Sequence, residues 1–65
     1  MTAAEINEAI RARYVEEAVG YRESAAYWLQ YATRNDSLGE TARRKHLHCL
    51  HLAWTAESRA AAVHS

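Results

Sequence analysis

The segment Asn35-Asp36-Ser37-Leu38-Gly39 decides the fold, because it is the only cluster of turn-forming residues in the 65-residue chain. Proline is absent and only two glycines occur, so little interrupts a helix on either side of this segment. The sequence therefore predicts an all-α fold, with a helix over about 3–34, a turn over about 35–38 and a helix over about 38–63. Residues 1–65 would form a single helical-hairpin domain.

Both predicted helices begin with the pattern of a capping box. Thr2 is followed three residues later by Glu5, and Ser37 is followed in the same way by Glu40. Gly39 falls in the first turn of the second helix, where its low helix propensity is tolerated, or in the loop if that helix starts two residues later. Gly20 is expected to be a tolerated mid-helix glycine, with a bend or a close approach of another helix as the alternatives.

Apolar residues follow helical spacing in both segments. The stripe on the first helix consists of Ile6, Ile10, Tyr14, Ala18, Tyr21, Ala25, Trp28 and Ala32. The stripe on the second helix is made of smaller side chains: Ala42, His46, Cys49, Ala53, Ala56, Ala60 and Val63. Folding at the turn brings the two stripes together, from Trp28 and His46 beside the turn to Ile10 and Val63 at the open end. Large side chains facing small ones fill space well, which favours an antiparallel two-helix hairpin.

A second apolar stripe has no cover within this hairpin. It comprises Leu47, Leu50 and Trp54 on the second helix and Val15, Val19 and Leu29 on the flank of the first. So short a chain has a marginal core, and one cysteine cannot form an internal disulfide. Burying two leucines and a tryptophan is worth several kcal/mol at about 25 cal/mol per Å². We therefore expect a homodimeric four-helix bundle with Leu47, Leu50, Trp54, Val15 and Leu29 at the interface; docking on a different protein is the alternative.

Charge is balanced, with eight Lys and Arg residues against eight Asp and Glu residues. Neither half of the chain has the single-sign field that a dedicated nucleic-acid or membrane binder needs. The apolar run 25–29 is far shorter than a membrane span, and the N-terminal segment lacks the basic region of a signal peptide. With one free thiol, these features lead us to expect a cytoplasmic protein without membrane partners.

The segment 46–51 contains the residue types that bind zinc, but their spacing is unfavourable. His46 and Cys49 lie on the small stripe, whereas His48 and His51 point to another side, so one helix supplies at most two ligands to a site. We expect no metal and no cofactor, although a dimer could combine two pairs across its axis. Cys49 is predicted to be a buried, inert thiol. The sequence thus favours a small non-enzymatic protein that binds or modulates a macromolecular partner, preferably a protein.

Arg43-Arg44-Lys45 is the one basic cluster, and it lies where cations oppose the dipole of the second helix. Ion pairs with Glu40 would explain it structurally. The alternative function is an RNA- or DNA-binding modulator, with Arg43, Arg44, Lys45 and Arg34 on phosphates. Tyr27 and Tyr31 could then stack on bases; otherwise we expect them at the edge of the dimer interface.

Overall fold

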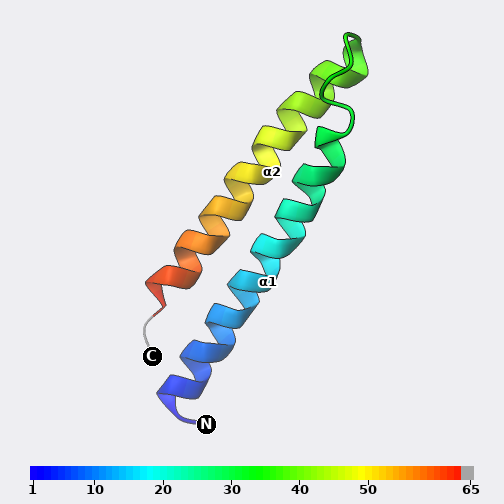
Figure 1. The fold of residues 1–65 in the computed structure, drawn as a ribbon. Coiled ribbons are helices and arrows are strands. Elements are labelled where there is room, and N and C mark those ends of the chain that lie inside the picture. Colours follow the sequence, from blue (N-terminus) through cyan, green and yellow to red (C-terminus); the bar gives the residue numbers. More distant parts are fainter. Residues whose placement is uncertain (64–65) are drawn as a thin grey trace.

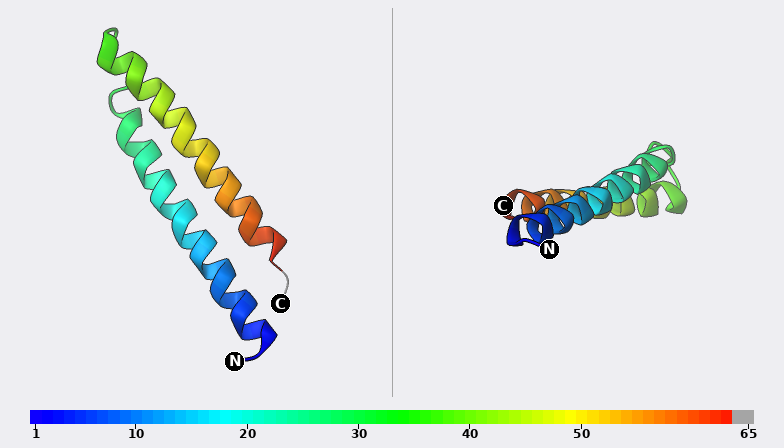
Figure 2. Two further views of the ribbon diagram at one scale, coloured as in Figure 1. Left: turned by 180° about the vertical axis from the view of Figure 1, so that it is seen from behind. Right: turned by 90° about the horizontal axis from the view of Figure 1, so that it is seen from below.

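The computed structural model describes residues 1–63 and contains two helices, α1 (Ala3–Leu29) and α2 (Ser37–Ala62). They lie side by side and antiparallel, joined by one turn (Figure 1). In two further views these helices form a single layer, with no third element over either face of the described part (Figure 2). The molecule is a rod of 53 × 14 × 11 Å. The predicted all-α antiparallel hairpin is confirmed.

The prediction that the first helix reaches about residue 34 is wrong by one turn. α1 ends at Leu29, and the chain continues through tight turns in which the Tyr31 N–H donates to the Trp28 carbonyl at 3.1 Å and the Arg34 N–H to the Tyr31 carbonyl at 3.2 Å. Such i→i+3 bonds commonly tighten the end of a helix. Here they carry the chain across from the axis of α1 to that of α2 (Figure 1).

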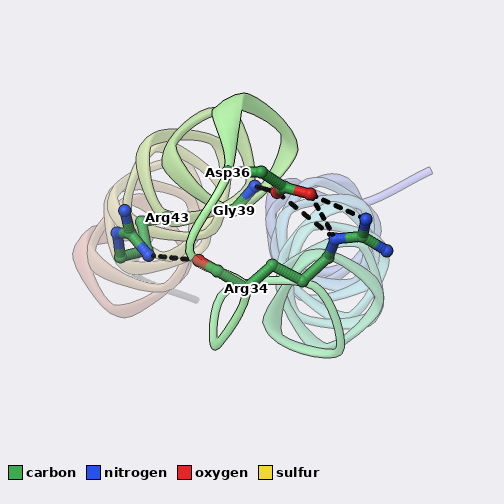
Figure 3. Close-up of polar contacts among 4 residues, drawn as sticks. All are labelled: Arg34, Asp36, Gly39 and Arg43. Atoms are coloured by element: carbon green, nitrogen blue, oxygen red, sulfur yellow. Dashed lines mark hydrogen bonds and ion pairs between the residues drawn. The ribbon is translucent and has the colours of Figure 1, made fainter.

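The cap of α2 is Asp36, not Ser37 as the capping-box pattern suggested. The Asp36 carboxylate accepts the Gly39 N–H at 3.0 Å, and the Asp36 carbonyl accepts the Glu40 N–H at 3.1 Å. Arg34 Nη2 donates a hydrogen bond to the same carboxylate from the other side, at 2.7 Å from Asp36 Oδ2 (Figure 3). An anchored negative charge also suits the positive end of the helix dipole. At the other helix, the Thr2 cap is confirmed, since its hydroxyl accepts the Glu5 N–H at 3.2 Å.

The two glycines have opposite roles. α1 runs unbroken through Gly20, which is exposed, and a Cβ added there would meet nothing within 4 Å. Gly20 is thus a tolerated mid-helix glycine, as expected. Gly39 is buried in the first turn of α2, and a Cβ added there would lie only 2.1 Å from the Arg34 carbonyl oxygen. The close approach of the turn to α2 therefore requires glycine at position 39.

The fully buried core consists of alanines. The structure buries Ala18 and Ala25 on α1 and Ala42, Ala53, Ala56 and Ala60 on α2, all of which belong to the two predicted stripes. His46 and Cys49 are half-buried beside them. Ile6 and Ile10 remain 44% and 41% exposed, because α1 extends past the end of α2 (Figure 1). Within residues 1–63 no large side chain is fully buried, so the hairpin hides little apolar area for its length.

Alanine substitution at the two glycines should have opposite effects on stability. Gly20→Ala should raise the free energy of unfolding by about 0.5–1 kcal/mol, because alanine loses less backbone entropy in a helix. Gly39→Ala should lower it by about 1–3 kcal/mol, because the new methyl group collides with backbone. Urea unfolding monitored by circular dichroism measures both. Equal effects of the two substitutions would contradict the described path of the turn.

Candidate interaction surface

One ion pair connects the exposed flanks of the two helices. Arg22 donates from Nε to Glu57 Oε2 and from Nη2 to Glu57 Oε1, both at 2.7 Å. This bidentate hydrogen bonding raises the pKa of Arg22 and lowers the pKa of Glu57. Because the two side chains meet, the flank of α1 that carries Arg22 and the flank of α2 that carries Glu57 lie on the same side of the hairpin.

Seven residues make almost two full turns of a helix, so residues seven apart share a flank. Val15 and Leu29 lie seven residues before and after Arg22, and Leu50 lies seven residues before Glu57. Leu47 and Trp54 are one turn before and one turn after Leu50, and Val19 is one turn after Val15. We call these six residues the apolar face: Val15, Val19, Leu29, Leu47, Leu50 and Trp54.

Most of the apolar face is open to solvent in the single chain. Leu47 is 65% exposed and Trp54 is 64% exposed, and Leu29 is 53% exposed. Val15 and Val19 are about half exposed, and Leu50 is half-buried. The five residues that the sequence assigns to an interface therefore lie together on one side of the hairpin.

The opposite side carries an aromatic cluster, which we call the aromatic flank: Tyr27, Trp28, Tyr31 and Lys45. The Tyr27 ring meets the Trp28 ring edge-on at 5.2 Å between centroids, and Lys45 Nζ lies 5.2 Å from the Trp28 ring centroid. A hydrogen bond with Tyr31 raises the pKa of Tyr27. Tyr27 lies five residues after Arg22, which turns it by about 140° around α1 from the Arg22 flank. The expectation that the two tyrosines lie at the edge of the dimer interface stays a prediction.

Two of the cations considered for nucleic-acid contact hold the turn together. Arg43 Nη1 donates to the carbonyl oxygen of Arg34 at 3.2 Å, beyond the end of α1 (Figure 3). It also donates to the carbonyl oxygen of Ala32 at 2.8 Å. Arg34 itself pairs with Asp36. A cation near the start of α2 is unfavourable because it faces the positive end of the helix dipole. The contacts of Arg43 offset this cost, since each carbonyl would otherwise depend on water for a hydrogen bond.

The other two cations point elsewhere. Successive residues of a helix are rotated by about 100°, so Arg43, Arg44 and Lys45 leave α2 in three directions. Lys45 lies over Trp28 on the aromatic flank, while Arg44 is exposed on the outer surface of α2. The four basic residues therefore do not form one patch on the hairpin.

The histidines and the cysteine are dispersed. His46 Nδ1 lies 2.8 Å from the Ala25 carbonyl oxygen, which fixes the imidazole between the helices. Cys49 is half-buried, His48 and His51 are exposed, and the His51 ring lies 6.2 Å from the Trp54 ring. Among the residues that the structure describes, no three His, Cys, Asp or Glu side chains are placed to hold a metal ion together. An open hollow along α1, lined by Ile10, Arg13, Tyr14 and Glu17, holds no such cluster either.

Sequence reasoning did not single out Arg22 and Glu57. They are 35 residues apart, and their pairing depends on how the two helices align. A signal was present, however, because each lies seven residues from leucines of the apolar face, Arg22 from Leu29 and Glu57 from Leu50. Placing the two charges on the predicted flanks would have suggested the pair.

Comparisons with known proteins found no match for this chain among family models, curated proteins or solved structures. Within residues 1–63, neither helix combines the length and the hydropathy that crossing a bilayer requires.

The cap of α2 should make stability depend on acid pH. Hydrogen bonds from Arg34 and from the Gly39 N–H lower the pKa of Asp36 from 3.8 to about 2. Because the folded pKa is the lower one, the stability that Asp36 adds is present above about pH 4 and is lost as the pH falls towards 2. Urea midpoints measured across this range should fall more steeply in the wild type than in Asp36→Asn, which keeps a capping oxygen without the charge. Parallel acid profiles would show that the ion pair does not stabilise the turn.

Proposed function

We propose that the protein is a non-enzymatic homodimer that binds or modulates a macromolecular partner, and that this partner is a protein. Two hairpins pack through their apolar faces to form a four-helix bundle. One observation carries the proposal: five of the six side chains of the apolar face are about half or more exposed, while the fully buried core contains only alanines. A large exposed apolar patch on a small protein marks an interaction site.

The exposed area is of the size that a stable dimer removes from water. The single chain exposes 4847 Å², whereas a compact monomer of 7.4 kDa would expose about 4200 Å². The excess is on the order of 600 Å², and a standard interface buries about 800 Å² per partner. A second copy lying along the rod could cover this much, because both helices extend along nearly its whole 53 Å length.

The energetics also favour a partner chain. Each large apolar side chain that becomes fully buried contributes about 1.5–3 kcal/mol. Burial of the apolar face would therefore contribute more hydrophobic free energy than burial of the alanine core does. This gain is available only if it exceeds the entropic cost of association, about 4–15 kcal/mol. Because these side chains are already about half-buried, six from each of two copies supply on the order of 9–18 kcal/mol, which is comparable with or larger than that cost.

The dimer would keep its aromatic flanks free for another protein. Tyr27 is 51% exposed and belongs to a cluster of three rings and one cation. Tyrosine and tryptophan are the usual anchors of protein interfaces. The nucleic-acid alternative has less support, because Arg34 and Arg43 are committed to the turn and the four cations share no side. We place the dimer in the cytoplasm, where the unpaired Cys49 would stay reduced.

Substitutions on the apolar face should weaken self-association. Trp54→Ala and Leu50→Ala each remove a large side chain from the interface, at a cost of about 2–5 kcal/mol. The dimer dissociation constant should then rise roughly 30-fold to more than 1000-fold. Sedimentation equilibrium of each variant gives that constant.

Leu52→Ala is the matched control for Leu50→Ala. Both leucines are half-buried on α2, but Leu52 lies seven residues after Lys45 and so belongs to the side of the aromatic flank. Leu52→Ala should lower hairpin stability without changing the dissociation constant. A similar loss of association in both variants would mean that the apolar face is not the interface.

Substitution of the aromatic flank should separate partner binding from dimer formation. Tyr27→Ala removes an anchor that lies outside the apolar face, so the variant should remain dimeric but capture less partner from extract at physiological salt. Leu47→Ala should have the opposite pattern, because it should weaken dimer formation more than it weakens capture of the partner. If wild-type protein recovers no protein partner, or if captured nucleic acid is released by added salt, the protein-partner proposal fails.

A further inference from the structure

We infer that the two copies associate with their turns at the same end, so that α1 of each copy packs against α2 of the other. This inference rests on the homodimer proposed above and adds its orientation. It follows from where one ion pair, Arg22–Glu57, lies within the apolar face.

Two hairpins that meet through the same face can obey a two-fold axis in two ways. If the axis runs along the helices, both turns lie at one end, and each α1 faces the α2 of the partner. If the axis crosses the helices, the turns lie at opposite ends, and each α1 faces the α1 of the partner. Neighbouring helices are antiparallel in both arrangements, so helix direction alone does not choose between them.

The spacing of residues on α1 separates the two arrangements. Val15, Arg22 and Leu29 occupy one flank at intervals of seven, so the charge lies midway between the two apolar side chains. With turns at opposite ends, pairing Val15 with Leu29 of the partner subunit places Arg22 against Arg22 of the partner subunit. The two guanidinium groups, each paired with Glu57 of its own chain, would then face one another where water is excluded and like charges repel.

The same-end arrangement replaces this repulsion between like charges with attraction between opposite charges. Arg22 then faces the α2 flank of the partner, which carries Glu57 of the partner subunit. Each arginine has two glutamates as neighbours, and the four charges alternate in sign around the two-fold axis. The existing Arg22–Glu57 pair, now exposed at 54% and 41% of its side chains, would enter the interface already hydrogen bonded. A pair that is satisfied before burial avoids leaving one charge alone in the interface.

Side-chain size agrees with this orientation. The contacts of His46 with Ala25 and of Lys45 with Trp28 show which residues of the two helices are level with one another. In this register Trp54 is level with Val19, and Leu47 lies close to the level of Leu29. The same-end arrangement keeps these levels across the interface, so Trp54 and Leu47 each meet a smaller or equal residue of the partner's α1, while Leu50 is level with the Arg22 charge. Large against small fills space without voids.

Spin labels at the turn can measure the orientation. The label is attached to Asn35→Cys, an exposed turn residue, in a Cys49→Ala background, with Ala3→Cys labelled separately at the open end. Dipolar spectroscopy then gives the distance between the two labels of a dimer. Light scattering and thermal melting confirm that each labelled variant keeps the mass and stability of the wild type.

The same-end arrangement predicts a short distance for both labels, on the order of 10–30 Å, because adjacent helices are about 8–10 Å apart. Turns at opposite ends, with Arg22 at the axis, would place the Asn35 labels about 40 Å apart and the Ala3 labels about 57 Å apart. Distances of that size would overturn the inferred orientation while leaving the dimer intact. A monomeric mass with no dipolar signal would overturn the proposed dimer, and the orientation with it.

Discussion

The close contact of two helices through alanine is the constraint on which the rest of the structure depends. Six alanines form the fully buried core, and their small side chains let α1 and α2 run together along a 53 Å rod. Small side chains also bury little area, so this contact contributes modest hydrophobic free energy. The large residues are left at the sides, and Trp54 and Leu47 are about two-thirds exposed. A core of this kind sets the helix register and leaves the large apolar side chains outside it.

The turn supplies what the alanine contact lacks, which is precise positioning by polar groups. Arg34 holds Asp36, Asp36 caps α2, and Arg43 reaches back to the carbonyl groups beyond α1 (Figure 3). Gly39 lets the backbone at Arg34 approach α2 closely. Arg34 and Arg43, two of the four charges that resemble a nucleic-acid site in the sequence, therefore have a structural role. The apolar face and the aromatic flank lie outside this network.

Features governed by periodicity could be predicted from the sequence, and features governed by the chain path could not. The turn segment 35–39 predicted the hairpin, the helical spacing of apolar residues predicted both contact stripes, and the Thr2 cap followed from local chemistry. The end of α1 at Leu29 and the cap at Asp36 depend on how residues 30–36 cross between the helices and on Arg34 and Arg43 folding back. Likewise, Arg22 and Glu57 become partners only once the register is known. Dimer formation, in contrast, remains a prediction.

The central claim is that a second chain covers the apolar face, and the mass of the wild-type protein across a dilution series tests it most directly. Sedimentation equilibrium should give twice the 7.4 kDa chain mass at high concentration, falling towards 7.4 kDa as the sample is diluted. Thermal stability should fall in parallel, because association and folding are linked by mass action. A mass of 7.4 kDa at every concentration, with cooperative melting that dilution does not change, would contradict the account.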